Sequence, residues 1–528
     1  MNNTVIIGCR PRRTREAAGW RAFITNAVGC AAILLGGAGN VIAGKTDSTA
    51  TANSALTYQP YDEVEIKAAL QHPLTLEGCI RTALSRNIAL RVAQGDLAKA
   101  EAGVSRSYGK FLPVFTLEGS KQQTKEDRPI DPEEPDSPTA FDFDNKGFVG
   151  TIGQTLITGA TLNFAVDLRR DINSPDRFGD PPTRTENRDY TATFTQPLLR
   201  DAWFKMARSE YSLAQHERHM QQASLDDSKL QTIFATKRAF YRVLLQRELI
   251  KVHQVAVQKD STLVLLSESK VKAMLATRRD VLSAEIRLAE DRAAFITSET
   301  EYQRSLDVLK DIMGLPIEMP VEVAGAELSY STDPLNEKVL IQRALKDSPL
   351  IRRAEFSVKS SRLQHSVARN QLLPRLDLSV QYNGRLDSDT DQNRTVNSKD
   401  WEATVSLRYP FLDRAASADA EKARVLVSQD EDRLADLQRQ IVLSLRDIVR
   451  SAYSSVEELS AIRRSIEAAE QKVDFATTMF NLGRASNFDI TDAQEALLKA
   501  QTSYLRKLVE YNEQLALLES LTGQPLTQ

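Results

Sequence analysis

The chain is poor in residues that break helices and in residues that crosslink a fold. Its 528 residues include only 22 glycines, 19 prolines and 3 cysteines. No glycine or proline occurs from Leu198 to Met313, and Gly483 is the only one from Phe411 to Thr522. Because glycine and proline oppose helix formation most strongly, these two stretches predict very long helices.

Two further absences narrow the class of protein. No run of about 18–20 apolar residues occurs after residue 44, which argues against a protein that crosses a membrane with several helices. The 68 basic and 71 acidic residues give a net charge of −3. Since this balance offers no general attraction to phosphate, we expect no nucleic-acid partner.

Motifs of enzymes are lacking as well. The sequence contains no nucleophile elbow, no Walker motif and no Cys-x-x-Cys, and the glycine cluster Gly36–Gly39 follows no predicted strand. His216 and His219 could share a metal by their spacing, but no third ligand is near them in a long amphipathic stretch. We therefore expect these histidines on the surface, and we predict no catalytic residue, no cofactor and no metal.

The N-terminus has the pattern of an export signal. A basic region is followed by an apolar stretch from Ala22 to Ala43, and Val41-Ile42-Ala43 fits a small-x-small cleavage site. We predict a signal peptide over residues 1–43 and a mature start near Gly44. A permanent membrane anchor and lipidation at Cys30 are the alternatives. The basic residues are Arg10, Arg12, Arg13, Arg15 and Arg21.

Disulfides cannot stabilise the chain once the predicted signal peptide is removed. Of the three cysteines, Cys9 and Cys30 lie in the predicted signal, so only Cys79 remains in the mature chain. An intramolecular disulfide is then impossible. Packing and strand pairing must hold this exported protein together.

An internal repeat organises the rest of the chain. Each half has a helical segment that ends in a Leu-Pro step, then strands, a second proline step, a long helical stretch and a Gly-x-Pro stop. The proline steps are Pro113 and Pro197 in the first half and Pro374 and Pro410 in the second; the stops are Gly314-Leu315-Pro316 and Gly523-Gln524-Pro525. The predicted divisions are a linker at 44–73, a first repeat at 74–316, a connecting or equatorial segment at 317–338 and a second repeat at 339–525.

The long stretches predict helical hairpins, at 200–313 and 413–522. About 110 residues of unbroken helix would extend roughly 165 Å, so each stretch should fold back once. Gly483 marks the turn in the second repeat, and alignment places the other turn around Met274–Thr277. In the second hairpin, small or apolar residues recur every three or four positions, which is typical of a coiled-coil seam. They include Leu434, Leu437, Ile441, Leu445, Ile448, Ala452, Val456 and Leu459.

Six short segments alternate between apolar and polar residues, as half-buried strands do. Four lie at about 114–196 and two at about 376–409, and the polar stretches 121–138, 171–188 and 387–399 between them are predicted to be surface loops. One apolar face and terminal aromatic residues such as Tyr190 and Trp401 are typical of a transmembrane β-barrel. Six strands are too few to close a water-filled barrel, so other copies of the chain must complete it.

These features together resemble the TolC family of outer-membrane efflux proteins. The most specific similarity is Phe480-Asn481-Leu482-Gly483-Arg484 followed by Asp489-Ile490-Thr491-Asp492-Ala493-Gln494. The resemblance implies an α+β membrane protein: a homotrimer with one shared transmembrane β-barrel in outer-membrane lipid and a long periplasmic α-helical barrel. It also implies that the helix tips meet a periplasmic adaptor protein of an inner-membrane pump. By resemblance, the usual barrel has four strands per subunit, and this chain departs from that number because its first half suggests an extra hairpin. Either the barrel is larger or two of the segments lie outside it.

The resemblance also assigns roles to residues at the helix tips. Asp489 and Asp492 would line the periplasmic entrance as two rings of carboxylates, or they would simply cap the helix that follows the turn. Like charges within a ring would raise the pKa of these carboxyls. Phe480 and Arg484 match residues that help to hold the entrance closed, although Phe480 lacks a hydroxyl. The turn residues Gly483, Arg278, Arg279 and Asp280 are expected to contact the adaptor, with ordinary solvated charge as the alternative for the arginines.

Two functions from different classes follow. The first is a passive export duct of a tripartite efflux or type I secretion system, located in the cell outer membrane with its helical barrel in the periplasm. The second is an exported soluble coiled-coil scaffold without a pore. Partition with outer membranes and a trimeric size in detergent would favour the duct.

Overall fold

The computed structural model describes residues 74–127, 140–175, 183–274, 276–325, 328–331, 335–389 and 394–523. The predicted signal peptide, the linker, Cys30 and the last proline of the second Gly-x-Pro stop lie outside these ranges. The chain divides into a unit of residues 1–66 and a unit of residues 67–528, and all described residues lie in the second.

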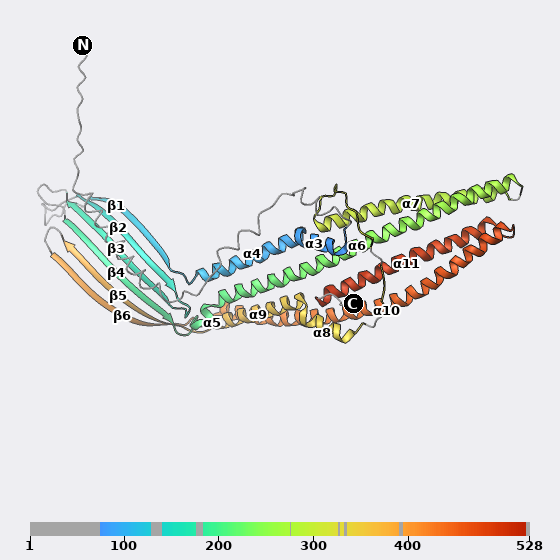
Figure 1. Ribbon diagram of the computed structural model, residues 1–528. Coiled ribbons are helices and arrows are strands. Elements are labelled where there is room, and N and C mark those ends of the chain that lie inside the picture. The colour runs from blue at the N-terminus through green and yellow to red at the C-terminus, as the bar shows by residue number, and fades with distance from the viewer. Residues whose placement is uncertain are drawn as a thin grey trace, which may run out of the picture. The chain divides into compact units, whose positions relative to one another are not determined.

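Helices and strands alternate in two rounds along this unit (Figure 1). The first round contains α3 (Leu76–Arg86), α4 (Ile88–Gly109), β1 (Val114–Asp127), β2 (Ala140–Thr155), β3 (Thr161–Pro175), β4 (Thr183–Pro197), α5 (Trp203–Ala207), α6 (Ser209–Lys272) and α7 (Arg278–Met313). The second contains α8 (Glu337–Asp347), α9 (Pro349–Asn370), β5 (Arg375–Asp389), β6 (Arg394–Arg408), α10 (Arg414–Asn481) and α11 (Asn487–Thr522).

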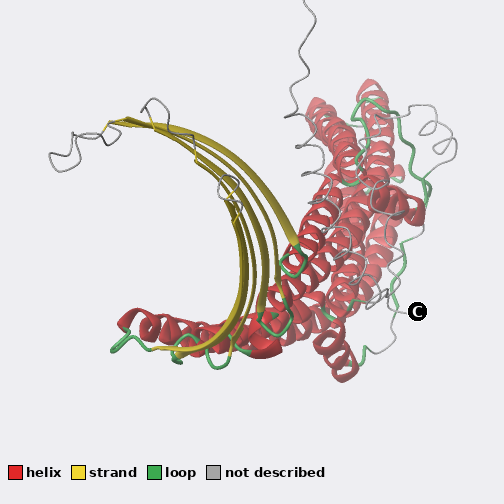
Figure 2. Ribbon diagram, turned by 90° about the vertical axis from the view of Figure 1, so that its left-hand side faces the viewer, coloured by secondary structure: helices red, strands yellow, loops and turns green. Residues whose placement is uncertain are grey.

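All six strands form one antiparallel sheet in the order β1-β2-β3-β4-β5-β6. Figure 2 shows this sheet as a curved band. Register pairing creates a continuous row of large or apolar side chains across the sheet. The next row, on the opposite face, is mainly polar, because neighbouring residues of a strand point to opposite faces. The first row is Phe115, Ile152, Phe164, Ala192, Tyr382 and Trp401, and the second is Thr116, Thr151, Ala165, Thr191, Asn383 and Asp400.

The predicted strands exist, but the predicted loops between them are much too long. β1 continues to Asp127 and β2 begins at Ala140, so residues 121–127 of the predicted loop 121–138 belong to a strand. Likewise β3 and β4 extend to residues 175 and 183, and β5 and β6 to 389 and 394. The prediction was wrong because these strand ends are mainly polar on both faces. Backbone pairing continues there although the apolar alternation has stopped, as in Lys121 opposite Lys146.

The four proline steps lie where the chain passes between helix and sheet. Pro113 and Pro374 directly precede β1 and β5, Pro197 ends β4, and Pro410 follows β6 by two residues. Proline has no backbone N–H to donate to a ladder, so strand ends are its natural positions in a sheet. Each exit into a long helix then needs a left-handed residue, Asp201 at φ 60° and Leu412 at φ 58°.

The helices form two long hairpins, α6 with α7 and α10 with α11 (Figure 1). The outgoing helices have 64 and 68 residues and both return helices have 36. At 1.5 Å per residue, the outgoing helices are about 100 Å long. The hairpins contact each other through α6 and α11. None of the described helices has the length and hydropathy needed to span a membrane.

The core of the second hairpin follows the predicted seam. Ile441, Leu445 and Ile448 are buried with residues of α8, α9 and α11, and farther along Ala452 and Leu459 pack against α11. Burial of such side chains contributes about 1.5–3 kcal/mol each. The seam therefore fixes how α10 lies against its return helix.

Candidate functional site

The tips of the two hairpins are the candidate site, and the turns there reverse the chain differently. In the second hairpin Gly483 takes φ 70°, a conformation that costs glycine little. In the first hairpin Met274 takes φ 58° and its side chain is 94% exposed. A methionine in this region is strained. The turn predicted around Met274–Thr277 is therefore present without the glycine that usually marks such a position.

Matching capping boxes begin both return helices. The Asp280 carboxylate accepts hydrogen bonds from the N–H and the hydroxyl of Thr277, at 2.9 and 2.7 Å. The Asp489 carboxylate accepts the same pair from Ser486, both at 2.8 Å. These bonds satisfy donors that a helix N-terminus otherwise leaves free. Within the subunit, both aspartates therefore serve as helix caps.

The capping bonds also set the charge of these aspartates. Hydrogen bonds from the Ser486 backbone and hydroxyl hold the pKa of Asp489 below its usual value, and those from Thr277 do the same for Asp280. The increase expected for Asp489 in a ring of like charges is thus opposed by its own cap. Asp492 lies one turn farther on and forms an ion pair with Lys472 of α10, with Nζ and Oδ2 2.5 Å apart.

Phe480 lies inside the tip rather than on its surface. Its side chain is 4% exposed and packs with Leu263 of α6 and Ile490 of α11. Lys270 of α6 places its Nζ 3.2 Å from the centre of the Phe480 ring and donates to the Phe480 carbonyl at 2.7 Å. This lysine joins the first hairpin to the C-terminal end of α10, where a positive charge is favoured.

Asn487 makes a second connection between the hairpins. Its side chain is 3% exposed and donates to the Ser267 hydroxyl at 2.6 Å and to the Asp280 carbonyl at 3.0 Å. One amide thus links the start of α11 to both helices of the first hairpin. Neither Lys270 nor Asn487 was predicted from the sequence as a tip residue. Asn487 is the first residue of α11, and an amide at a helix start is visible in the sequence. Its hydrogen-bond partners in the other hairpin are not.

The outer surface of the tips combines positive charge with apolar side chains. The three arginines expected there, Arg278, Arg279 and Arg484, are all exposed. Leu482 and Phe488 are 63% and 74% exposed beside them. Behind this surface, an open groove of about 380 Å³ runs between α6 and the second hairpin, with Leu263, Thr477 and Phe480 among its lining residues.

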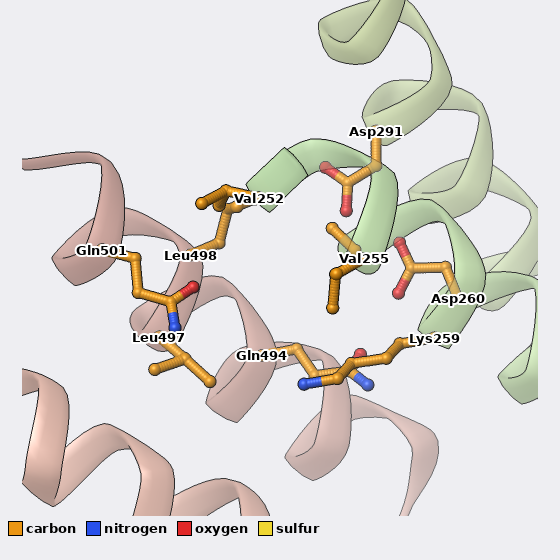
Figure 3. Close-up of a pocket in the computed structure, with 10 residues that line it drawn as sticks. Val252, Val255, Lys259, Asp260, Asp291, Gln494, Leu497, Leu498 and Gln501 are labelled. Atoms are coloured by element: carbon orange, nitrogen blue, oxygen red, sulfur yellow. The ribbon is translucent and has the colours of Figure 1, made fainter. Parts of the chain in front are cut away.

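A buried acidic pair lies farther from the tip. Asp260 of α6 and Asp291 of α7 are 2% and 5% exposed, and Arg287 approaches Asp291 with Nε and Oδ2 3.5 Å apart. Figure 3 shows both carboxyl groups at a cavity that residues of α11 complete. The pair was not predicted from the sequence, although Asp260 is three and seven residues before the buried Leu263 and Ser267, a seam spacing that a charge rarely occupies.

The two histidines considered as metal ligands pack against an aromatic ring. His219 stacks on Phe356 of α9 with ring centres 4.7 Å apart, and His216 lies 6.1 Å from the same ring. Desolvation and the nearby charge of Lys359 lower the pKa of His216. Across the described ranges, no three histidine, cysteine or acidic side chains come together as a metal site would need.

The fold joins one six-stranded antiparallel sheet to two long helical hairpins, and known proteins with this arrangement can be compared with it. Residues 340–524 match the family model described as "Outer membrane efflux protein". Nodulation protein T of Rhizobium leguminosarum bv. trifolii is 23% identical over 57% of this chain and 65% of its own length. The cobalt-zinc-cadmium resistance protein CzcC of Cupriavidus metallidurans is 23% identical over 65% of this chain and 79% of its own.

Solved structures show the same fold. The outer-membrane channel OprN superposes with a TM-score of 0.63 at 19% identity, covering 92% of this chain and 97% of its own. The Campylobacter jejuni CmeC outer membrane channel gives 0.62 at 15% identity, covering 85% of each chain. The family match covers residues 340–524, and the superpositions show that the fold of these channels extends over most of the chain.

Proposed function

We propose that three copies of this chain form a passive export duct through the outer membrane and the periplasm. The observation that carries the proposal is the six-stranded sheet with an uncovered apolar face and two open edges. Trp401, Val405 and Leu407 of β6 are 65–74% exposed on that face. In water, large exposed apolar patches mark a surface that contacts a partner or lipid.

The edges of the sheet require further copies. β1 and β6 each pair on one side only among the described strands. Unpaired backbone groups cannot face lipid, and about eight strands are the fewest that close a transmembrane barrel. Because six is even, β1 and β6 run in opposite directions, so β6 of one copy can pair antiparallel with β1 of the next. Rotational symmetry then closes the ring.

Three copies would give an eighteen-stranded barrel, by multiplying the six strands of one sheet. The family resemblance supplies the number three. Barrels of 16–18 strands leave an aqueous channel, and diameter grows about linearly with strand number. The two extra strands are part of the continuous sheet here, so the barrel should be about one and a half times as wide as one with four strands per subunit.

The two hairpins of each copy would continue the duct. Three copies contribute six hairpins, and helices about 100 Å long can cross a periplasmic space. The equal or nearly equal helix lengths in the two rounds support the two internal repeats inferred from sequence, 74–316 and 339–525, joined by 317–338. The exposed arginines and apolar residues at the tips suit contact with a periplasmic adaptor that connects the duct to an inner-membrane pump.

Asp489 and Asp492 are proposed to face the entrance at these tips. Both are exposed, and threefold symmetry would triple each charge. Such carboxylate rings favour cations. Replacing both by asparagine should abolish cation preference in a salt-gradient reversal potential without dissociating trimers. A double variant with the wild-type preference would leave these aspartates only their capping role.

Fractionation followed by bilayer recording tests the function as a whole. The duct should sediment with outer membranes, have the mass of three chains in detergent and conduct ions in planar bilayers. The second candidate is an exported soluble coiled-coil scaffold, for which the long helical seams are the supporting observation. Recovery of a soluble protein that never conducts would favour the scaffold and refute the duct.

A further inference from the structure

The buried acidic pair of the first hairpin, Asp260 and Asp291, has fewer hydrogen-bond donors and less counter-charge than two buried carboxylates require. A buried charge is costly unless a counter-charge or donor accompanies it. Within the described part of the chain, Oδ2 of Asp260 is buried and has no hydrogen-bond partner. It lines a cavity of about 30 Å³, together with Gln494, whose buried Oε1 is also unpartnered among these residues. The space is large enough for a water molecule or a small ion.

The surrounding positive charge does not neutralise the pair. Nε of Arg287 in α7 lies 3.5 Å from the Asp291 carboxylate. Nη1 of the same arginine lies 3.5 Å from Glu290 and 3.6 Å from Glu495 of α11. Lys259 of α6 lines the same cavity. One arginine divided among three carboxylates leaves net negative charge around Asp260.

Every helix packed against the pair contributes titratable or polar groups. α6 presents Lys259 and His253, and α7 presents Arg287 and Glu290. α11 presents Glu495 and Gln494, and its Arg506 acts on His253. Burial lowers the pKa of His253, so the neutral ring supplies no charge to Asp291 at neutral pH.

We propose that Asp260 and Asp291 bind one proton between them, and that this proton holds α6, α7 and the adjoining α11 together. The protonated carboxyl donates a hydrogen bond to the other carboxylate, which gives the pair the donor that it lacks. When the proton leaves to solvent, two buried carboxylates face each other. The repulsion then loosens the contact between α6 and α7, and water enters the cavity that α11 completes.

The energetics support a site that titrates near neutrality. Burial, the hydrogen bond with Asp291 and the charge of Asp291 together raise the pKa of Asp260 to about 7, against the lowering effect of Arg287. An opened hairpin would restore a value near 4. Since the packed state binds the proton more tightly, the contact is strongest in acid. The equilibrium constant for forming the contact falls by about tenfold per pH unit between about pH 4 and 7, and is constant above pH 7.

A direct measurement is the infrared carbonyl band of a protonated carboxylic acid in the full-length protein in detergent. The band should persist above the pH at which ordinary carboxyls ionise and disappear with a midpoint near 7. It should be absent in Asp260→Asn and unchanged in Asp311→Asn, an exposed aspartate of the same helix as Asp291. His253→Gln should retain it. A wild-type protein without the band would overturn the proposal.

Hydrogen exchange measures the mechanical consequence. Asparagine keeps the size of the neutral acid and does not titrate, so comparison with Asp260→Asn at each pH cancels intrinsic exchange. Amides around residues 256–264 and 287–294 should open about a hundredfold more in wild type at pH 7 than at pH 5, relative to the variant. If hydrogen exchange had the same pH dependence in wild type and in Asp260→Asn, the shared proton would be refuted. Protection restored by calcium alone would assign the cavity to a cation instead and would equally overturn it.

A consequence for gating rests on the proposed function. If the duct opens by loosening of the first hairpin and of its contact with α11, the shared proton favours the closed arrangement at lower pH. Wild-type openings should then become more frequent between pH 5 and 7, while Asp260→Asn should show no such increase. A protein that never conducts would refute the duct but leave the infrared result to decide the proton site.

Discussion

The two hairpins have almost the same dimensions but are held together by different chemistry. Both return helices have 36 residues, begin at a capping box and end on a left-handed glycine, Gly314 or Gly523. The buried seam of α10 is mainly leucine, isoleucine and alanine. The seam of α6 and α7 includes Asp260, Asp291 and Ser267.

The comparison shows that the length of a hairpin and the dependence of its stability on solution conditions have different causes. Local signals at the ends set the length of a helix, and those signals match in both hairpins. An apolar seam is stable whenever it is buried, because its contribution depends on area alone. A seam with buried carboxyls is stable only while its hydrogen bonds and its proton are present. The first hairpin is therefore the one that solution conditions can loosen.

Truncation of the apolar seam should have the largest effect. Leu445 is fully buried, so Leu445→Ala should lower the free energy of unfolding by about 2–5 kcal/mol through lost burial and a cavity. Leu443→Ala, at a side chain that is 58% exposed, should change it by less than about 0.5 kcal/mol. Denaturant unfolding of the two variants measures both. Similar losses would mean that the seam does not carry the stability of this hairpin.

Removal of the link between the tips should have the next largest effect. Asn487→Ala deletes two hydrogen bonds and leaves the Ser267 hydroxyl and the Asp280 carbonyl without this donor. Local opening should become easier by about 1–3 kcal/mol. Limited proteolysis near residues 274–277 would detect it, with the exposed Asn481→Ala as the control. Unaltered protection would show that the tips are joined elsewhere.

The two turns can be exchanged in a reciprocal pair of variants. Met274→Gly should stabilise the fold by about 0.5–1 kcal/mol, because relief of left-handed strain exceeds the entropic cost of glycine. Gly483→Ala should destabilise it by a similar amount; no atom lies within 4 Å of the added Cβ, so the effect is purely conformational. Thermal unfolding should shift in opposite directions. A shift of the same sign in both variants would contradict the comparison.

The smallest effect concerns the two capping carboxylates. Since hydrogen bonds lower the pKa of Asp280 and Asp489, they contribute stability above the unfolded-state pKa near 4. That contribution is lost as pH falls through their folded-state pKa values. Asp489→Asn and Asp280→Asn should each remove a similar small part of the acid sensitivity of the tip, visible in exchange of the first helical turn. Acid sensitivity that is unchanged in both variants would exclude this role.

Much of the fold could be predicted because periodicity and breakers act locally. The absence of glycine and proline located both long hairpins, and alternation located all six strands. The ends of the strands were not predicted, because backbone pairing continues the ladder beyond Lys121 where the alternation of apolar and polar side chains has stopped. At the tips, Asp489 and Gly483 were visible in the sequence, but Lys270 and Asn487 act on residues more than two hundred positions away. Such partners depend on how the hairpins pack.

Closure of the barrel by neighbouring copies is the central claim, and a disulfide scan between edge strands tests it most directly. Thr404→Cys in β6 would be combined in turn with Thr116→Cys, Glu118→Cys and Ser120→Cys in β1, all on the polar face by register. The native Cys79 is fully buried and burial raises its pKa to about 12, so it should stay silent.

Oxidation of membrane-embedded protein should produce covalent ladders that end at three chains, in one register of the scan. The inner-strand control, Thr404→Cys with Thr151→Cys of β2, should give none. Ladders that stop at two chains, or no crosslink from any register, would contradict a trimeric barrel with six strands from each copy.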